Sequence, residues 1–215
     1  MRTVLQTMTT RDALVAEVRK QILSGELAPG EPLTENGLAA KFGVARPTVR
    51  SALQVLLSRH LAQQAGGRSL VVPAFTEADV RDLYFVRTPL ELEAVRRIVE
   101  NELSLDAAEQ SLRALEALPR DASWGDRVEA HTAFHIALIN AAGSPRLSRI
   151  YPAMQEEMQL CLAQLRASYP GPQDLAREHR ALLEAIRSGD PDHAQAEMRA
   201  HLERTLHDLT SADAD

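Results

Sequence analysis

The sequence predicts a mainly helical protein of two domains, and three observations carry that prediction. Aromatic residues are only 4% of the 215 residues, while Ala, Leu, Glu and Arg dominate, which favours helices over sheets. Apolar residues recur at helical spacing through most of the chain. The charge is also unevenly distributed along the chain. Residues 1–75 carry nine basic and five acidic side chains (net +4), whereas residues 76–215 carry 15 basic and 25 acidic ones (net −10).

The first 75 residues have the order of a winged helix-turn-helix domain. Apolar spacing predicts a helix over residues 10–24 and another over residues 45–59. Between them, Thr34 caps a short helix that ends at Gly43. The segment LAQQAGGRSLVVP follows and is typical of two short strands in a hairpin. Three helices followed by a hairpin predict a winged helix-turn-helix in residues 1–75.

Residues 76–215 predict an all-helical antiparallel bundle of about six helices. Thr76 opens the capping sequence T-E-A-D before a helix to about Leu103. Caps, prolines and glycines delimit the later helices, which are expected over 104–118, 126–142, from 145 onward, over 172–188 and over 191–209.

The composition also excludes some classes of protein. One cysteine, Cys161, cannot form an internal disulfide framework and fits a reducing compartment. The N-terminal MRTVLQTMTT has no apolar stretch, and no run approaches ~18 apolar residues, so we expect neither a secretory signal nor a membrane span. These features predict a cytoplasmic protein.

The helix at residues 45–59 has the side chains that a DNA-reading helix needs. Arg46 and Arg50 lie four residues apart on one face, with Thr48 between them. Arginine can contact guanine with two hydrogen bonds, and threonine can contact a phosphate or a thymine methyl group. At the hairpin tip, Gly66 lets the backbone approach DNA closely, and Arg68 could reach a phosphate or the minor groove. The alternative is that these arginines form an ordinary solvated face.

Residues 10–73 resemble the N-terminal domain of GntR-type transcriptional regulators. The G-x-L-x-P-G turn, L-A-x-x-F-G-V and R-x-x-V-R-x-A-L occur in the family's order. The resemblance implies a homodimer on a palindromic operator, with DNA contacts at Arg46, Thr48, Arg50 and Gly66. Three positions depart from the pattern: Asn36 replaces a usual Arg, Ala45 a usual Ser or Thr, and His60 a common Gly.

Four histidines of the second domain lie on faces that should turn inward. His131 and His135 are four residues apart on one helix, and His179 and His201 share apolar stripes of two later helices. Buried imidazoles need partners for both nitrogens, so these four could converge on one metal ion. The alternative is four separate core histidines, each with its own hydrogen bonds.

Residues 77–209 resemble the FCD domain of the FadR branch of this family. The matching pieces are LYFVRTPLELEAVRR, HTAFHIALINAAG, EHRALLEAI and MRAHL. The resemblance implies a divalent metal held by His131, His135, His179 and His201, where His131 replaces the family's Asp. A site of four neutral nitrogens shifts the preference toward zinc or nickel, with copper also suited.

Arg87 lies on an apolar helix stripe, where a guanidinium group is costly unless it is paired. Glu91, one turn away, could pair with it; alternatively Arg87 binds the carboxylate of a small effector that also touches the metal. Ser144 stands where many FCD members have Asn beside the pocket.

Together these features predict a ligand-responsive transcriptional repressor that is not an enzyme. Its expected partners are palindromic double-stranded DNA, a small carboxylate and a second copy of the chain. Two alternatives stay open, a metal sensor and a metal-dependent hydrolase with an attached DNA-binding domain. The hydrolase lacks an H-E-x-x-H motif, and Glu129 is on a different face from the histidines.

Overall fold

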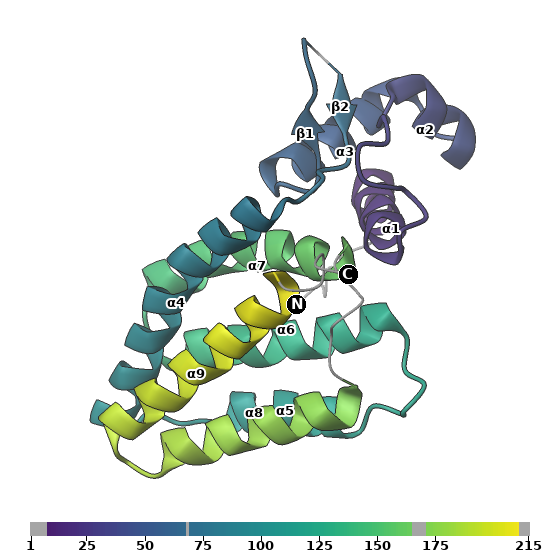
Figure 1. Cartoon of the computed structure of the whole chain (residues 1–215). Coiled ribbons are helices and arrows are strands. Elements are labelled where there is room, and N and C mark those ends of the chain that lie inside the picture. The colour runs from purple at the N-terminus through teal and green to yellow at the C-terminus, as the bar shows by residue number, and fades with distance from the viewer. Residues whose placement is uncertain (1–7, 68, 165–170, 211–215) are drawn as a thin grey trace, which may run out of the picture. The chain divides into compact units, whose positions relative to one another are not determined.

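The computed structural model describes residues 8–67, 69–164 and 171–210 (Figure 1). The chain divides into two compact units, Met1–Ala74 and Phe75–Asp215. No helix among the described residues is long and apolar enough to cross a membrane.

The first unit is a three-helix domain with a small hairpin. Its elements are α1 (Thr10–Ser24), α2 (Glu35–Phe42), α3 (Arg46–Ser58), β1 (Gln63–Gln64) and β2 (Leu70–Val71), and the two strands pair antiparallel. Helices α1 and α3 pack together through a core that includes Val18, Val49 and Leu56, none of which is exposed. The predicted winged helix-turn-helix order is therefore confirmed.

Helix ends in the first unit follow from their capping residues. The Thr34 side chain accepts a hydrogen bond from the Gly37 amide (3.1 Å), and α2 ends at Gly43 in the left-handed region (φ 63°). Helix α3 begins after Ala45, which has no side-chain cap, as expected from the departure at this position. His60 has φ 58°, a backbone conformation that glycine adopts more easily, so the common glycine of the family has a physical reason here.

The second unit is a bundle of six helices among the described residues, which confirms the predicted fold class. They are α4 (Glu77–Glu100), α5 (Asp106–Glu116), α6 (Trp124–Ala141), α7 (Pro145–Gln164), α8 (Pro172–Arg187) and α9 (Pro191–Thr210). Helix α4 packs along α9, α6 lies between α5 and α7, and α8 contacts both α5 and α9 (Figure 1).

Several predicted helix ends needed correction, among them both ends of α5, which spans Asp106–Glu116 where residues 104–118 were expected. Helix α4 was expected to reach about Leu103 but ends at Glu100, because Glu102 has φ 51° and breaks the helical backbone. Helix α6 starts at Trp124 and not at residue 126, because the Ser123 side chain caps it by accepting from the Asp126 amide (3.2 Å).

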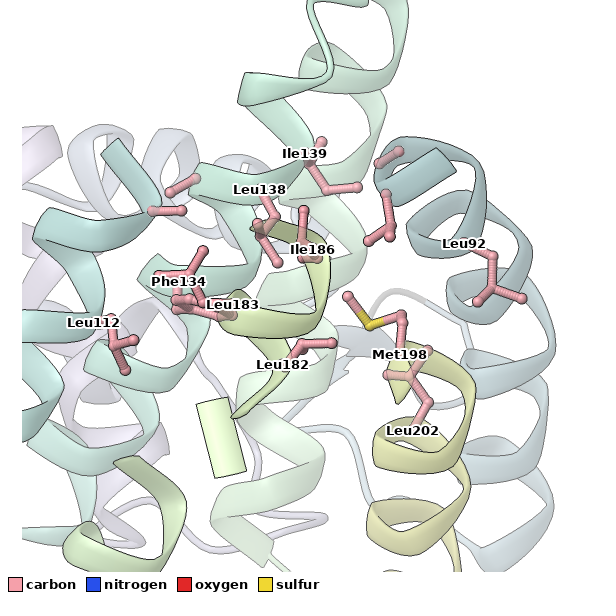
Figure 2. Close-up of a cluster of buried hydrophobic side chains, with 14 of the residues drawn as sticks. Leu92, Leu112, Phe134, Leu138, Ile139, Leu182, Leu183, Ile186, Met198 and Leu202 are labelled. Atoms are coloured by element: carbon pink, nitrogen blue, oxygen red, sulfur yellow. The ribbon is translucent and has the colours of Figure 1, made fainter. Parts of the chain in front are cut away.

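The apolar core of the second unit joins all six helices that the structure describes there. Figure 2 shows Phe134 and Leu138 of α6 beside Leu182, Leu183 and Ile186 of α8, with side chains of α4, α5 and α9 around them. Phe134 and Leu183 are fully buried. Because this core packs α6, α8 and α9 together, the histidines on these helices are held at fixed positions.

Candidate functional site

The exposed face of α3 carries the side chains that the sequence predicts for DNA contact. Arg46 and Arg50 are exposed, while Val49 between them is completely buried, so the helix separates a solvent face from a core face. Thr48 is half-buried. Gly66 lies in the turn between β1 and β2 with φ 66°. Arg68 is outside the described residues.

Arg50 is held by Glu35, a contact that the sequence did not predict. The Arg50 Nε and Nη2 atoms donate to the two Glu35 oxygens at 2.7 and 2.9 Å. These hydrogen bonds lower the pKa of Glu35, which is at the start of α2. The pair is fifteen residues apart on different helices, so no periodicity could have indicated it. Glu35 therefore restricts the directions in which the Arg50 guanidinium can point.

The four predicted histidines come together inside the second unit. His131 and His135 come from α6, His179 from α8 and His201 from α9, and all four are buried. One ligand nitrogen from each lies within 4.8 Å of the other three. The Nε2 atom of His135 is 3.1 Å from that of His131 and 3.2 Å from that of His179. Nitrogens that share a tetrahedral zinc ion are about 3.3 Å apart, given Zn–N distances of about 2.0–2.1 Å.

Hydrogen bonds on the outer nitrogens orient two of these rings. His135 Nδ1 contacts Glu91 Oε2 at 2.7 Å, and His179 Nδ1 donates to the Leu175 carbonyl at 2.7 Å. With the proton on Nδ1, the Nε2 lone pairs of both rings are available toward the cluster, as is common for metal-bound histidines. His201 makes no hydrogen bond with any described residue, although its Nδ1 is 3.7 Å from Glu178.

Burial keeps the imidazoles of His131, His135 and His179 neutral, which is the form that binds metal. It lowers the pKa of His135 to about 4, even though the Glu91 carboxylate opposes the shift. Burial, together with the neighbouring histidines, holds the pKa of His131 and of His179 well below the ordinary value. Four imidazole nitrogen donors at these distances fit a borderline divalent ion such as Zn²⁺.

Arg87 is 1% exposed and lies in the same network. Its Nε atom donates to Glu91 Oε1, and Nη1 is 3.4 Å from the Tyr84 hydroxyl. Nη2 has no hydrogen-bond partner among the described residues. Burial would lower the pKa of Arg87, but Glu91 raises it above the ordinary value, so the guanidinium stays charged. The pairing with Glu91 thus uses Nε, and the neighbouring Nη2 donor has no hydrogen-bond partner among the described residues.

Glu91 links Arg87 to the histidine cluster. Its carboxylate accepts from Arg87 and from the Tyr151 hydroxyl (2.5 Å), and its other oxygen contacts His135. Burial would raise the pKa of Glu91, but Arg87 and His135 hold it below the ordinary value. The sequence predicted Glu91 only as a partner of Arg87. Its contacts to α6 and α7, and Tyr151 itself, had no signal in the sequence.

The remaining predicted positions have simpler surroundings. His193 and His207 are exposed on α9, and Glu129 is exposed on α6. The Ser144 side chain accepts from the Leu147 amide (3.4 Å) and so caps α7.

Comparison with known proteins identifies the family. Residues 10–72 match the family described as bacterial regulatory proteins, gntR family, and residues 82–204 match the FCD domain. The chain is 29% identical to the probable D-xylose utilization operon transcriptional repressor of Paenarthrobacter nicotinovorans, over 95% of this chain and 94% of that protein. It is 26% identical to the gluconate operon transcriptional repressor of Bacillus licheniformis, over 87% of this chain and 80% of that protein.

The fold comparison agrees with the sequence comparison. A crystal structure of a GntR regulator from Rhodococcus sp. RHA1 has a TM-score of 0.82 at 22% identity, covering 94% of this chain and 98% of that one. The chain belongs to the gntR family of bacterial regulatory proteins and carries a C-terminal FCD domain. It is a DNA-binding transcriptional regulator, and its named relatives are regulators and not enzymes.

Proposed function

We propose that this protein is a cytoplasmic repressor whose homodimer binds a palindromic operator and is released by a small carboxylate. The observation that carries the proposal is the Nη2 donor of buried Arg87, which has no partner in the described part of the chain; Glu91 joins Arg87 to the four-histidine cluster. A buried guanidinium with a free donor is suited to bind a carboxylate. The two repressors among the relatives support the negative direction of control.

In this proposal the first unit reads DNA. Arg46 and Arg50 contact base edges in the major groove, Thr48 contacts a phosphate, and Gly66 and Arg68 bring the hairpin tip to the neighbouring backbone. Exposure of both arginines on one face of α3 supports these roles. The +4 charge of this unit is modest, so base contacts and dimerisation must supply much of the affinity.

His131, His135, His179 and His201 would hold the metal ion, with zinc or nickel suited to four neutral nitrogens. The ion would supply a positive charge beside the bound carboxylate. Glu91 contacts both His135 and Arg87. The same carboxylate would therefore orient the residue that binds the ion and the residue that binds the effector. The effector acts on DNA affinity only if it binds two arrangements of the dimer with different affinities.

Metal analysis of the purified protein, followed by operator binding with and without a chelator, tests the proposal. We expect about one ion per chain, unchanged DNA affinity in chelator, and loss of the response to carboxylates. A large change of DNA affinity on chelation alone would instead show a metal sensor. This second candidate is favoured by the complete enclosure of all four histidines, which leaves the ion little access to an outside ligand.

Arg87→Met supplies the matching variant, because it removes the guanidinium and keeps an apolar chain of similar length. We expect it to bind the operator and the metal, but its operator affinity should not change when a carboxylate is added. A variant that still responds to carboxylates would overturn the effector site.

A further inference from the structure

The ion pair between Glu35 and Arg50 connects the two helices of the helix-turn-helix. Glu35 is the first residue of α2, and Arg50 lies on the exposed face of α3. The Glu35 carboxylate accepts hydrogen bonds from Arg50 Nε at 2.7 Å and from Arg50 Nη2 at 2.9 Å. The Arg50 side chain is 65% exposed and that of Glu35 is 33% exposed, so the pair lies on the surface of the first unit.

The geometry of this pair determines which donors of Arg50 remain available. A guanidinium group carries its N–H donors in one plane and in a fixed fork. The Nε and Nη2 atoms that Glu35 engages form the side edge of the group. The end edge, which consists of Nη1 and the second hydrogen of Nη2, donates to no described residue. Two such donors side by side match the O6 and N7 acceptors of guanine.

Arg46 differs from Arg50 in this respect. It is exposed on the same helix, but its guanidinium donates to no described residue. The hydrogen bonds of Arg50, with a smaller contribution from the charge of Arg46, lower the pKa of Glu35, so the carboxylate is ionised at neutral pH. A free arginine loses side-chain entropy when it binds a base, whereas the Arg50 guanidinium is already oriented by Glu35.

A carboxylate on a surface that contacts DNA also has a cost. DNA phosphates repel it, and it offsets the positive charge of Arg50, so it weakens binding to every sequence alike. Such a group is favourable where it increases the difference in affinity between the correct sequence and all others.

We propose that Glu35 is a specificity-determining residue, which orients the end edge of Arg50 toward one guanine of the operator. The proposal rests on the proposed function, in which Arg50 contacts a base edge. Glu35 acts through Arg50 and contacts no base itself, so it is a positioning residue. Without its carboxylate, Arg50 can turn to a phosphate instead, and DNA binding becomes less selective.

Selection of bound duplexes from a randomised DNA library, with the full-length protein, identifies the guanine. Arg50→Lys keeps the positive charge but removes the planar edge with its two donors. The sequences that this variant selects should therefore lose the guanine at one position of each half-site. The other selected positions serve as the internal reference.

The guanine preference is measured as a ratio of dissociation constants, for the selected duplex and for the same duplex with adenine at that position. For the wild type we expect at least about fivefold, as for a contact with two hydrogen bonds. Glu35→Gln removes the charge at the same size and should lower this ratio at least about threefold. The corresponding ratio at a second selected position should not change.

The salt dependence of binding gives an independent readout. In Glu35→Gln the affinity for unrelated duplex DNA should rise, because Arg50 is free to bind a phosphate. The slope of log affinity against log salt concentration should become steeper by up to about one. A purely structural role of Glu35 would weaken binding to all sequences and would not produce a steeper slope.

Glu26→Gln is the matched control. It removes one negative charge from another exposed ion pair of the same unit, in which Glu26 contacts Lys41 of α2 at 2.9 Å. This variant should keep the guanine preference and the salt dependence of the wild type. The two glutamine variants should have similar melting temperatures, because exposed ion pairs contribute little to stability.

The outcomes distinguish this inference from the function on which it rests. If Arg50→Lys loses no guanine position, the base contact of Arg50 is wrong and the role of Glu35 is overturned with it. If Arg50→Lys loses a position at which Glu35→Gln keeps the full preference, Arg50 still reads DNA but Glu35 does not orient it. A preference that falls equally at all positions in Glu35→Gln would also overturn the positioning role.

Discussion

The single carboxylate of Glu91 contacts polar groups of three side chains that lie on three helices. It binds Arg87 on its own helix, His135 on α6 and Tyr151 on α7, and all four residues are buried. A buried ion pair contributes little net stability, because removal of both charges from water opposes their attraction. Removal of only one of the two charges is costly, however, because the other charge then stays buried without a partner.

Glu91→Ala is therefore expected to lower the free energy of unfolding by about 3–5 kcal/mol, because Arg87 would be left uncompensated. Urea unfolding of the metal-free protein, followed by circular dichroism, measures it. The matched control is Glu93→Ala, which removes an exposed partner of Arg96 and should change stability by at most about 1 kcal/mol. Equal effects of the two variants would contradict the role of Glu91.

Ala45 is a second position where a single residue decides local stability. Its backbone is already extended (φ −68°, ψ 141°), as an N-cap requires, but alanine offers no side-chain acceptor. Ala45→Ser should stabilise α3 by about 1 kcal/mol. Hydrogen exchange of the α3 amides in the full-length protein should slow accordingly, and unchanged exchange would show that serine does not cap here. Ala45→Val, which adds bulk without a cap, is the control.

At the scale of elements, α6, α8 and α9 build the histidine cluster, and α4 and α7 supply Glu91 and Tyr151 beside it. The periodicity of α6 correctly predicted that His131 and His135 face inward. It could not show that Tyr151 of α7 contacts the Glu91 carboxylate. That contact depends on how far one helix is shifted along another, which core packing decides.

The packing of these helices makes the metal-free protein sensitive to acid. Burial lowers the pKa of His135 to about 4, whereas an unfolded histidine titrates near ~6.5. Between these values the unfolded chain binds more protons, so the stability is complete above pH ~6.5 and falls as the pH decreases toward 4. Each such histidine adds up to about 1.4 kcal/mol per pH unit.

Urea unfolding at several pH values in chelator measures this dependence. His193→Gln, which changes an exposed histidine, should leave the curve unchanged. A flat curve between pH 6.5 and 4.5 would show that the buried histidines are not held neutral.

At the scale of the whole molecule, a net charge of −6 combines a basic DNA-binding segment with an acidic helical one. Net charge alone argues against a nucleic-acid partner, and its distribution argues for one. The contact between Arg50 and Glu35 reduces the free positive charge of α3 further. Because little positive charge is available to attract phosphates, operator affinity should depend strongly on base contacts of the two exposed arginines.

We expect Arg46→Ala combined with Arg50→Ala to lower operator affinity at least about 30-fold, since a guanine contact contributes about 1–3 kcal/mol. Gel-shift titration with the promoter fragment of the protein's own gene measures it. Arg81→Ala, an exposed arginine of α4, is the matched control and should bind normally. A double variant that shifts the fragment as well as the wild type would refute the DNA-reading role of α3.

The sequence by itself determined the helical class, the winged helix-turn-helix order and the inward face of all four histidines, because these follow from local spacing and capping. It also placed Arg46 and Arg50 on the exposed face of α3. Only the tertiary structure decided that Glu91 bridges Arg87 to His135 and that Glu35 holds Arg50. Those relations join residues of different helices, and their relative positions come from the packing of the whole core and not from the period of any one helix.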